Sequence, residues 1–96
     1  MNQQTQASQP AVKPATTSLK TKAPIINDKM ATYLKNLRND NNLTMRALAD
    51  VIGTPHSFIG KIEQQGRRMD VGEFILYCQS MNKNPTVALQ DIIDSL

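Results

Sequence analysis

The sequence has little of what catalysis, metal binding or membrane insertion requires. Its 96 residues include one cysteine, one histidine and no tryptophan. A lone cysteine cannot form an internal disulfide, which is typical of proteins in a reducing cytosol. One histidine without clustered carboxylates or a glycine-rich phosphate loop predicts no metal site and no catalytic centre. No apolar run approaches the ~20 residues of a membrane span, and no signal-peptide pattern opens the chain. We therefore expect a cytoplasmic protein that is not an enzyme and uses no cofactor or small-molecule ligand.

The N-terminal segment, residues 1–26, is of low complexity. It is rich in Gln, Thr, Ala, Ser, Pro and Lys. Because its apolar residues are too few to offset the entropy of ordering, we expect a disordered tail before a single domain at 27–96. Two interpretations of the tail stay open: a linker or solubilising segment, and a flexible arm whose lysines contact phosphates.

The charge is distributed unevenly along a chain whose net charge is +3. The first 27 residues carry three lysines and no acid. Residues 35–68 hold six basic and three acidic residues, whereas residues 69–96 hold one basic and four acidic residues. A basic segment beside an acidic one is expected when one face of a protein meets a polyanion.

From Asn27 onward, apolar residues recur at helical spacing and no strand pattern competes. Thr44, the Asp70 and Glu73 pair, and Asn84-Pro85 are typical of helix starts. Gly66 is a typical stop. The expected helices contain residues 30–37, 45–52, 55–64, 71–81 and 85–96. The sequence thus predicts an all-α fold of five helices, with Val71, Phe74, Ile75, Cys78 and Met81 on the apolar stripe of the fourth.

The segment Met45–Gln64 has the pattern of a helix-turn-helix. Ala49 is small enough for two helices to cross closely, and Gly53 supplies the left-handed conformation that ends the first helix. Thr54 is expected to cap the second helix and Pro55 to occupy its first position. In DNA-binding proteins this arrangement places the second helix in the major groove.

Over residues 31–95, the chain resembles the phage repressor and Cro family of helix-turn-helix regulators, also called XRE-like. The motifs that carry the resemblance are Leu37-Arg38, Leu43-Thr44-x-x-x-Leu48-Ala49, Gly53, Ile59-x-x-Ile62-Glu63, Gly66-Arg67-Arg68 and Asn84-Pro85. Each pattern alone is common, whereas their order and spacing together are specific. The resemblance implies a compact five-helix bundle of the repressor/Cro type.

The resemblance also implies how DNA would be contacted. The positions that would read base edges are His56, Ser57, Phe58 and Lys61. The positions that would contact phosphates are Thr44, Met45, Arg46, Arg67 and Arg68. Two of these depart from the family pattern. Met45 stands where glutamine is usual, and a thioether cannot donate a hydrogen bond. Phe58 is large for its position, so it either touches a thymine methyl or folds over the core.

Other residues are expected to act within the protein. The resemblance implies a structural ion pair between Arg38 and Glu63, which fixes the first helix under the third. Arg67 or Arg68 could instead pair with Asp70 or Glu73. Cys78 lies on an apolar stripe, which predicts a buried thiol rather than a redox sensor.

These features predict a sequence-specific double-stranded DNA-binding regulator, with an autoregulatory repressor as the main hypothesis. Few base contacts come from one small helix-turn-helix, so we expect a homodimer on a near-palindromic operator at the nucleoid. The surplus apolar residues near the C-terminus predict the dimer interface at Val87, Ile92, Ile93 and Leu96. Three alternatives stay open: an antitoxin that also neutralises a toxin, a restriction-modification controller, and an adaptor without DNA binding.

Overall fold

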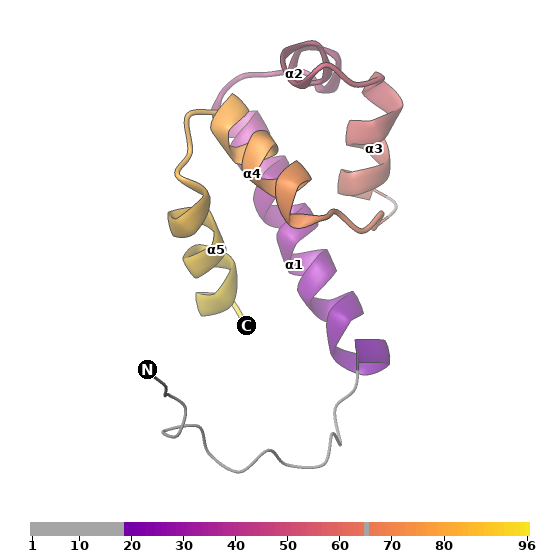
Figure 1. Ribbon diagram of the computed structural model, residues 1–96, viewed down its shortest axis with the longest axis vertical. Coiled ribbons are helices and arrows are strands. Elements are labelled where there is room, and N and C mark those ends of the chain that lie inside the picture. Colours follow the sequence, from indigo (N-terminus) through magenta and orange to yellow (C-terminus); the bar gives the residue numbers. More distant parts are fainter. Residues whose placement is uncertain (1–18, 65) are drawn as a thin grey trace, which may run out of the picture.

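The computed structural model describes residues 19–64 and 66–96, which form five α-helices and no strand (Figure 1). The helices are α1 (Leu19–Asp40), α2 (Met45–Ile52), α3 (His56–Gln64), α4 (Val71–Ser80) and α5 (Pro85–Asp94). The predicted all-α, five-helix fold is therefore confirmed.

Three helices begin at the capping residues that the sequence predicts. The Thr44 hydroxyl accepts a hydrogen bond from the Ala47 amide (3.0 Å) at the start of α2. Asp70 and Glu73 form a reciprocal capping box at α4. Asn84 caps α5, whose first residue is proline. Each cap satisfies an amide that the helix itself leaves unpaired.

Helix α1 is longer than the sequence predicts. It begins at Leu19, so the predicted boundary between residues 26 and 27 falls inside it. Lysine, leucine and alanine favour helix, and extending an existing helix avoids the cost of nucleation. Pro24 lies inside α1 and lacks the amide that would donate to the carbonyl four residues earlier, so it weakens this part of the helix without ending it. Residues 19–26 are therefore helical, and the rest of the predicted tail, residues 1–18, lies outside the described residues.

Helix α3 begins at His56, one residue later than predicted. The expectation that Thr54 caps it is wrong, because its Oγ1 is buried and has no hydrogen-bond partner among the described residues. The chain turns instead through a hydrogen bond from the Phe58 amide to the Pro55 carbonyl (3.0 Å). Pro55 stands just before the helix, where its fixed φ is tolerated.

The core lies where the five helices meet. Helix α2 packs against α3 and α4, α1 packs against α3 and α5, and α4 packs against α5. The buried cluster consists of Leu34, Leu48, Ala49, Ile59, Ile62, Phe74, Tyr77, Cys78, Met81, Ala88 and Ile92. Figure 1 shows the N-terminal turns of α1 extending beyond the other four helices. The core thus holds α3 in place, while the first turns of α1 stand apart from it.

Two predictions about apolar residues are wrong. Ile92, predicted at the dimer interface, is 3% exposed and shares the inner face of α5 with Ala88, four residues earlier. Val71 is 74% exposed because it occupies the first position of α4, at the edge of the packed face. Tyr77, which the predicted stripe omitted, is fully buried.

Candidate nucleic-acid interface

The turn between α2 and α3 brings these helices to a close crossing. Gly53 has φ +86°, a left-handed conformation that ends α2. The amides of Gly53 and Thr54 both donate to the Ala49 carbonyl, at 2.7 and 3.0 Å. Ala49 is buried, and its small side chain leaves room for α3. The backbone geometry is that of a helix-turn-helix.

The outer face of α3 is polar and exposed, in contrast to its two buried isoleucines. His56, Ser57 and Lys61 all lie on the exposed face. Gln64 is exposed as well, although the sequence patterns did not single it out. Gln64 lies three residues after Lys61 and seven after Ser57, so all three share one side of the helix. This spacing could have identified Gln64 from the sequence. This face offers hydrogen-bond donors and acceptors of several kinds.

Phe58 and Arg67 contact each other rather than projecting outward. Phe58 is half-buried and packs against the core, and the Arg67 guanidinium lies 4.6 Å from its ring centroid. Arg67 also forms an ion pair with Glu73, with distances of 3.2 and 3.4 Å. Hydrogen bonding by Arg67 lowers the pKa of the Glu73 carboxyl. Arg67 was expected either to contact phosphate or to pair with an acidic residue, and the structure shows it paired with Glu73. Phe58 was expected either to touch a base or to fold over the core, and the structure shows it packed against the core.

The N-terminus of α2 is a second polar surface. Thr44 and Arg46 are exposed there, and the unpaired amides of the first turn point outward along the helix dipole. Met45 is half-buried and packs against the core cluster. Its thioether therefore supplies packing, and only its backbone amide can act as a donor.

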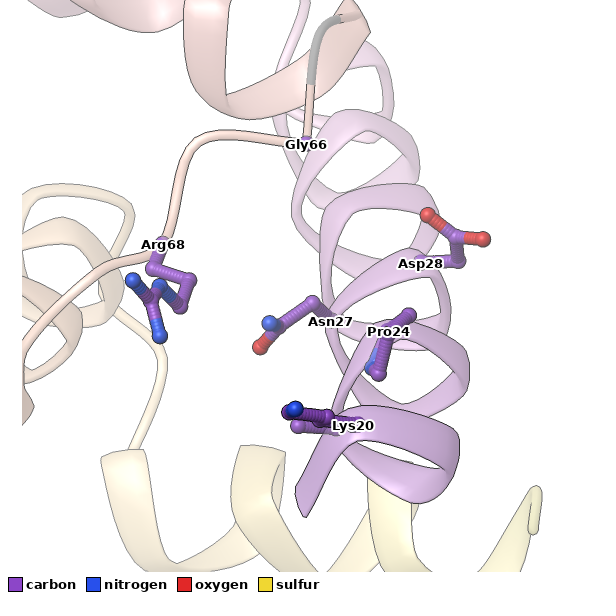
Figure 2. A pocket seen from close by; sticks show the side chains of 7 residues that line it. Lys20, Pro24, Asn27, Asp28, Gly66 and Arg68 are labelled. Carbon is purple, nitrogen blue, oxygen red and sulfur yellow. The ribbon is translucent and has the colours of Figure 1, made fainter.

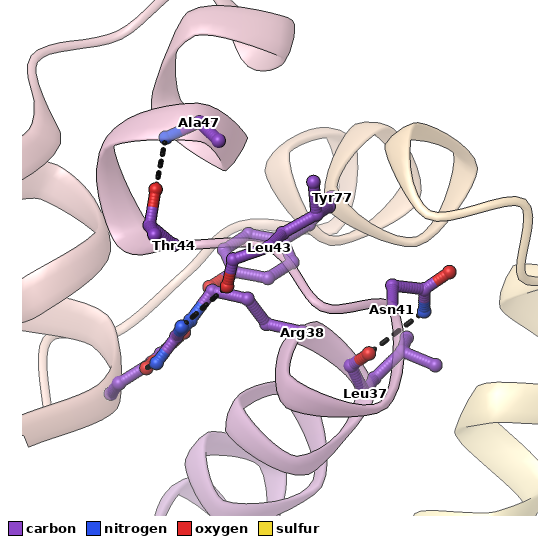
Figure 3. Close-up of polar contacts among 8 residues, drawn as sticks. Leu37, Arg38, Asn41, Leu43, Thr44, Ala47 and Tyr77 are labelled. Carbon is purple, nitrogen blue, oxygen red and sulfur yellow. Dashed lines mark hydrogen bonds and ion pairs between the residues drawn. The ribbon is translucent and has the colours of Figure 1, made fainter.

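A buried polar network holds α3 against α1 and α4 (Figure 3). The Arg38 guanidinium donates two hydrogen bonds of 2.8 Å to the Glu63 carboxylate, whose side chain is 0% exposed. It donates a third to the Leu43 carbonyl (2.7 Å), and the Tyr77 hydroxyl donates to Glu63 Oε2 (2.9 Å). Hydrogen bonding to Glu63 raises the pKa of Arg38, while burial and then the Glu63 charge raise the pKa of Tyr77. The predicted pair of Arg38 and Glu63 is present, and Tyr77 extends it to α4.

Neither a metal site nor a membrane span is found in the part of the chain that the structure describes. Within residues 19–64 and 66–96, no group of His, Cys, Asp or Glu could hold a metal ion. No helix in these ranges is long and apolar enough to cross a membrane. Cys78 is buried, and burial raises the pKa of its thiol to about 11, so the thiol form dominates at neutral pH.

Comparisons with known proteins decide the family. Residues 34–87, more than half of the chain, match the helix-turn-helix family. An XRE-family like protein from Pseudomonas syringae pv. tomato is 32% identical, with a TM-score of 0.65 over 81% of this chain and 98% of that one. The chain belongs to the XRE-like helix-turn-helix family. This is a family of DNA-binding transcription regulators rather than enzymes.

This helix-turn-helix regulator is also similar to two controller proteins, one in sequence and one in fold. The control protein C.SmaI of Serratia marcescens is 28% identical over 57 residues, which cover 59% of this chain and 68% of that protein. The restriction-modification controller protein C.Esp1396I has the same fold, with a TM-score of 0.66 at 19% identity over 72% of this chain and 90% of that one.

In this regulator, the candidate DNA-contacting groups occupy connected segments. Helices α2 and α3 pack together, and the loop after α3 is tied back to it by a hydrogen bond from the Arg67 amide to the Lys61 carbonyl (3.0 Å). Arg68 follows in that loop with its side chain exposed. The N-terminus of α2, the outer face of α3 and this loop, which are linked by this packing and this hydrogen bond, make up the candidate interface.

A separate apolar surface lies on α5. Leu89 and Ile93 are each 50% exposed, and their spacing of four residues places them on one face of the helix. Leu96, just beyond the end of α5, is 58% exposed. Val87 is 46% exposed on the same helix. Of the four predicted interface residues, only Ile92 is unavailable to a second molecule.

Proposed function

We propose that this regulator is a sequence-specific repressor that binds double-stranded DNA near its own gene, at the nucleoid in the cytoplasm. The supporting observation is the exposed polar face of α3, on a helix held rigidly by the Arg38, Glu63 and Tyr77 network. A rigid helix that presents donors and acceptors suits the major groove, where base pairs differ in hydrogen-bonding pattern.

Each exposed residue has a proposed role. Lys61 donates to guanine O6 or N7, while His56 and Ser57 contact neighbouring base edges. Thr44, Arg46 and the first amides of α2 bind phosphates on one side of the groove, and Arg68 binds them on the other. Phe58 supports Arg67 by stacking, so we assign it no base.

The test is the substitution Lys61→Ala on a site selected from random duplexes by the full chain. If Lys61 reads a base, the variant loses about 1–3 kcal/mol on the selected site and relaxes the preference at one position. Lys35→Ala is the matched control, because Lys35 is an exposed lysine of α1 outside this surface. An equal loss on all sequences would demote Lys61 to a phosphate contact.

The regulator acts as a homodimer in this proposal. Leu89 and Ile93 form an apolar stripe on α5 that would be buried between two copies, with Val87 on the same helix and Leu96 just beyond its end. Two α3 helices would then read half-sites about one helical turn apart, ~34–36 Å, on a near-palindromic operator.

A second candidate is supported by sequence similarity to C.SmaI, a control protein. A restriction-modification controller would have the same DNA-binding chemistry but regulate a neighbouring nuclease or methyltransferase gene. Mapping the selected site upstream of such a gene, rather than upstream of the regulator's own gene alone, would favour this candidate.

A further inference from the structure

A basic cleft lies outside the helix-turn-helix, between the first turns of α1 and the loop that follows α3 (Figure 2). Its volume is about 520 Å³, and its lining includes Lys20, Asn27 and Asp28 from α1 and Arg68 from the loop. The first turns of α1 are the part of the helix that sequence patterns did not predict. The cleft therefore exists because α1 begins at Leu19 rather than near residue 27.

Three nitrogen-bearing side chains line this cleft: Lys20 and Asn27 from α1 and Arg68 from the loop. Figure 2 shows the Lys20 and Asn27 side chains extending from α1 toward the side on which Arg68 lies, while the Asp28 carboxylate extends the other way. Neither Lys20 nor Arg68 makes a side-chain hydrogen bond or ion pair with any described residue, in contrast to Arg67. With Lys20 and Arg68 against Asp28, the lining has a net charge of +1.

We propose that this cleft binds a phosphate of the DNA backbone beyond the contacts made by α2 and α3. The inference rests on the proposed DNA-binding function and adds a site to it. A planar guanidinium, an ammonium and an amide that line one cleft are groups that bind phosphate oxygens, and neither cation is occupied by a described residue. The cleft is also continuous with the candidate interface, since its loop follows α3 directly and is hydrogen-bonded to Lys61.

The contact is expected to add affinity without sequence information, because phosphates are the same at every base pair. It also explains a feature that is unfavourable in the free protein. The first turn of α1 carries Lys20 and no acid, so its charge opposes the helix dipole. A phosphate beside Lys20 removes that conflict.

The test compares Lys20→Gln with Lys29→Gln in the full chain. Lys20 and Lys29 are exposed lysines of the same helix, nine residues apart and hence on opposite faces, and Lys29 does not line the cleft. The readout is the dissociation constant on the selected duplex and on a scrambled duplex, between 50 and 200 mM salt. Circular dichroism checks that both variants keep their helix content.

We expect Lys20→Gln to weaken binding to both duplexes by a similar factor and to reduce the salt slope by about 0.9, the value for one lost phosphate contact. Lys29→Gln should keep the wild-type slope. Asp28→Asn should strengthen DNA binding, because it removes the only carboxylate of the cleft lining. Ethylation interference should show one phosphate whose effect disappears in Lys20→Gln.

Several results would overturn the proposal. Equal effects of Lys20→Gln and Lys29→Gln would mean that DNA affinity depends on the overall charge of α1 and not on the cleft. An unchanged slope in Lys20→Gln, with wild-type DNA binding intact, would leave the cleft outside the interface, as a site for inorganic phosphate or for an acidic protein segment. If the wild-type protein binds no DNA at all, the proposed function itself fails, which is a distinguishable outcome.

Discussion

At the scale of single residues, the orientation of α3 depends on one buried carboxylate. Glu63 accepts hydrogen bonds from Arg38 and Tyr77, so a single side chain joins α3 to α1 and α4. The resemblance predicts the pair with Arg38. Tyr77 could not be predicted in the same way, because its hydroxyl reaches a residue fourteen positions earlier and apolar periodicity carries no information on that contact.

Arg38→Met should cost about 3–5 kcal/mol in the free energy of unfolding, because it leaves a fully buried carboxylate without its cation. The matched control is Arg67→Met, which removes an arginine from the more exposed pair with Glu73 and should cost less than about 1 kcal/mol. Urea unfolding followed by circular dichroism measures both. Similar small losses in the two variants would contradict the structural role of the buried pair.

At the scale of helices, two glycines of the helix-turn-helix, Gly53 and Gly60, have different structural roles. Gly53 has a positive φ in the turn after α2, and a Cβ there would meet no atom within 4 Å. Gly60 lies inside α3, and a Cβ there would meet only side-chain atoms of Gln64 and Met45, at 3.9 Å. Position 53 requires glycine because of its left-handed backbone conformation. Position 60 has enough space for the Cβ of alanine.

The same substitution should therefore change stability in opposite directions. Gly53→Ala should lower the free energy of unfolding by about 1–2 kcal/mol, because an L-residue is strained in the left-handed region. Gly60→Ala should raise it by about 0.5–1 kcal/mol, because alanine loses less backbone entropy in a helix. Thermal unfolding of the two variants beside the wild type decides between these outcomes, and a stable Gly53→Ala protein would refute the strain.

Sequence patterns predict the starts of three helices correctly, whereas the predicted cap Thr54 does not cap α3. Thr44, Asp70 and Asn84 each begin a helix as expected, since their side chains bond the first unpaired amides. The start of α1 is harder to predict, because Pro24 and its polar neighbours are also typical of a disordered tail. The cleft between α1 and the loop at Arg68 could therefore not be predicted, because it depends on that extension and on how distant segments pack.

At the scale of the whole molecule, the apolar stripe of α5 is the proposed dimer interface. Ile93→Asp should raise the dimer dissociation constant at least about tenfold, since it places a charge in a buried apolar contact. Ile25→Asp is the control, because Ile25 is 55% exposed on α1 and does not belong to the stripe. Sedimentation equilibrium measures both, and an Ile93→Asp protein that dimerises normally would exclude α5 from the interface.

We propose above all that the polar surface of α2, α3 and the following loop binds a specific DNA sequence. The most direct measurement is the dissociation constant of the full chain on the DNA upstream of its gene and on scrambled duplex, across a salt series. We predict a preference of at least about 10³-fold for the upstream DNA that persists at physiological salt. Weak binding without preference at any salt concentration would contradict the account and direct attention to a protein partner.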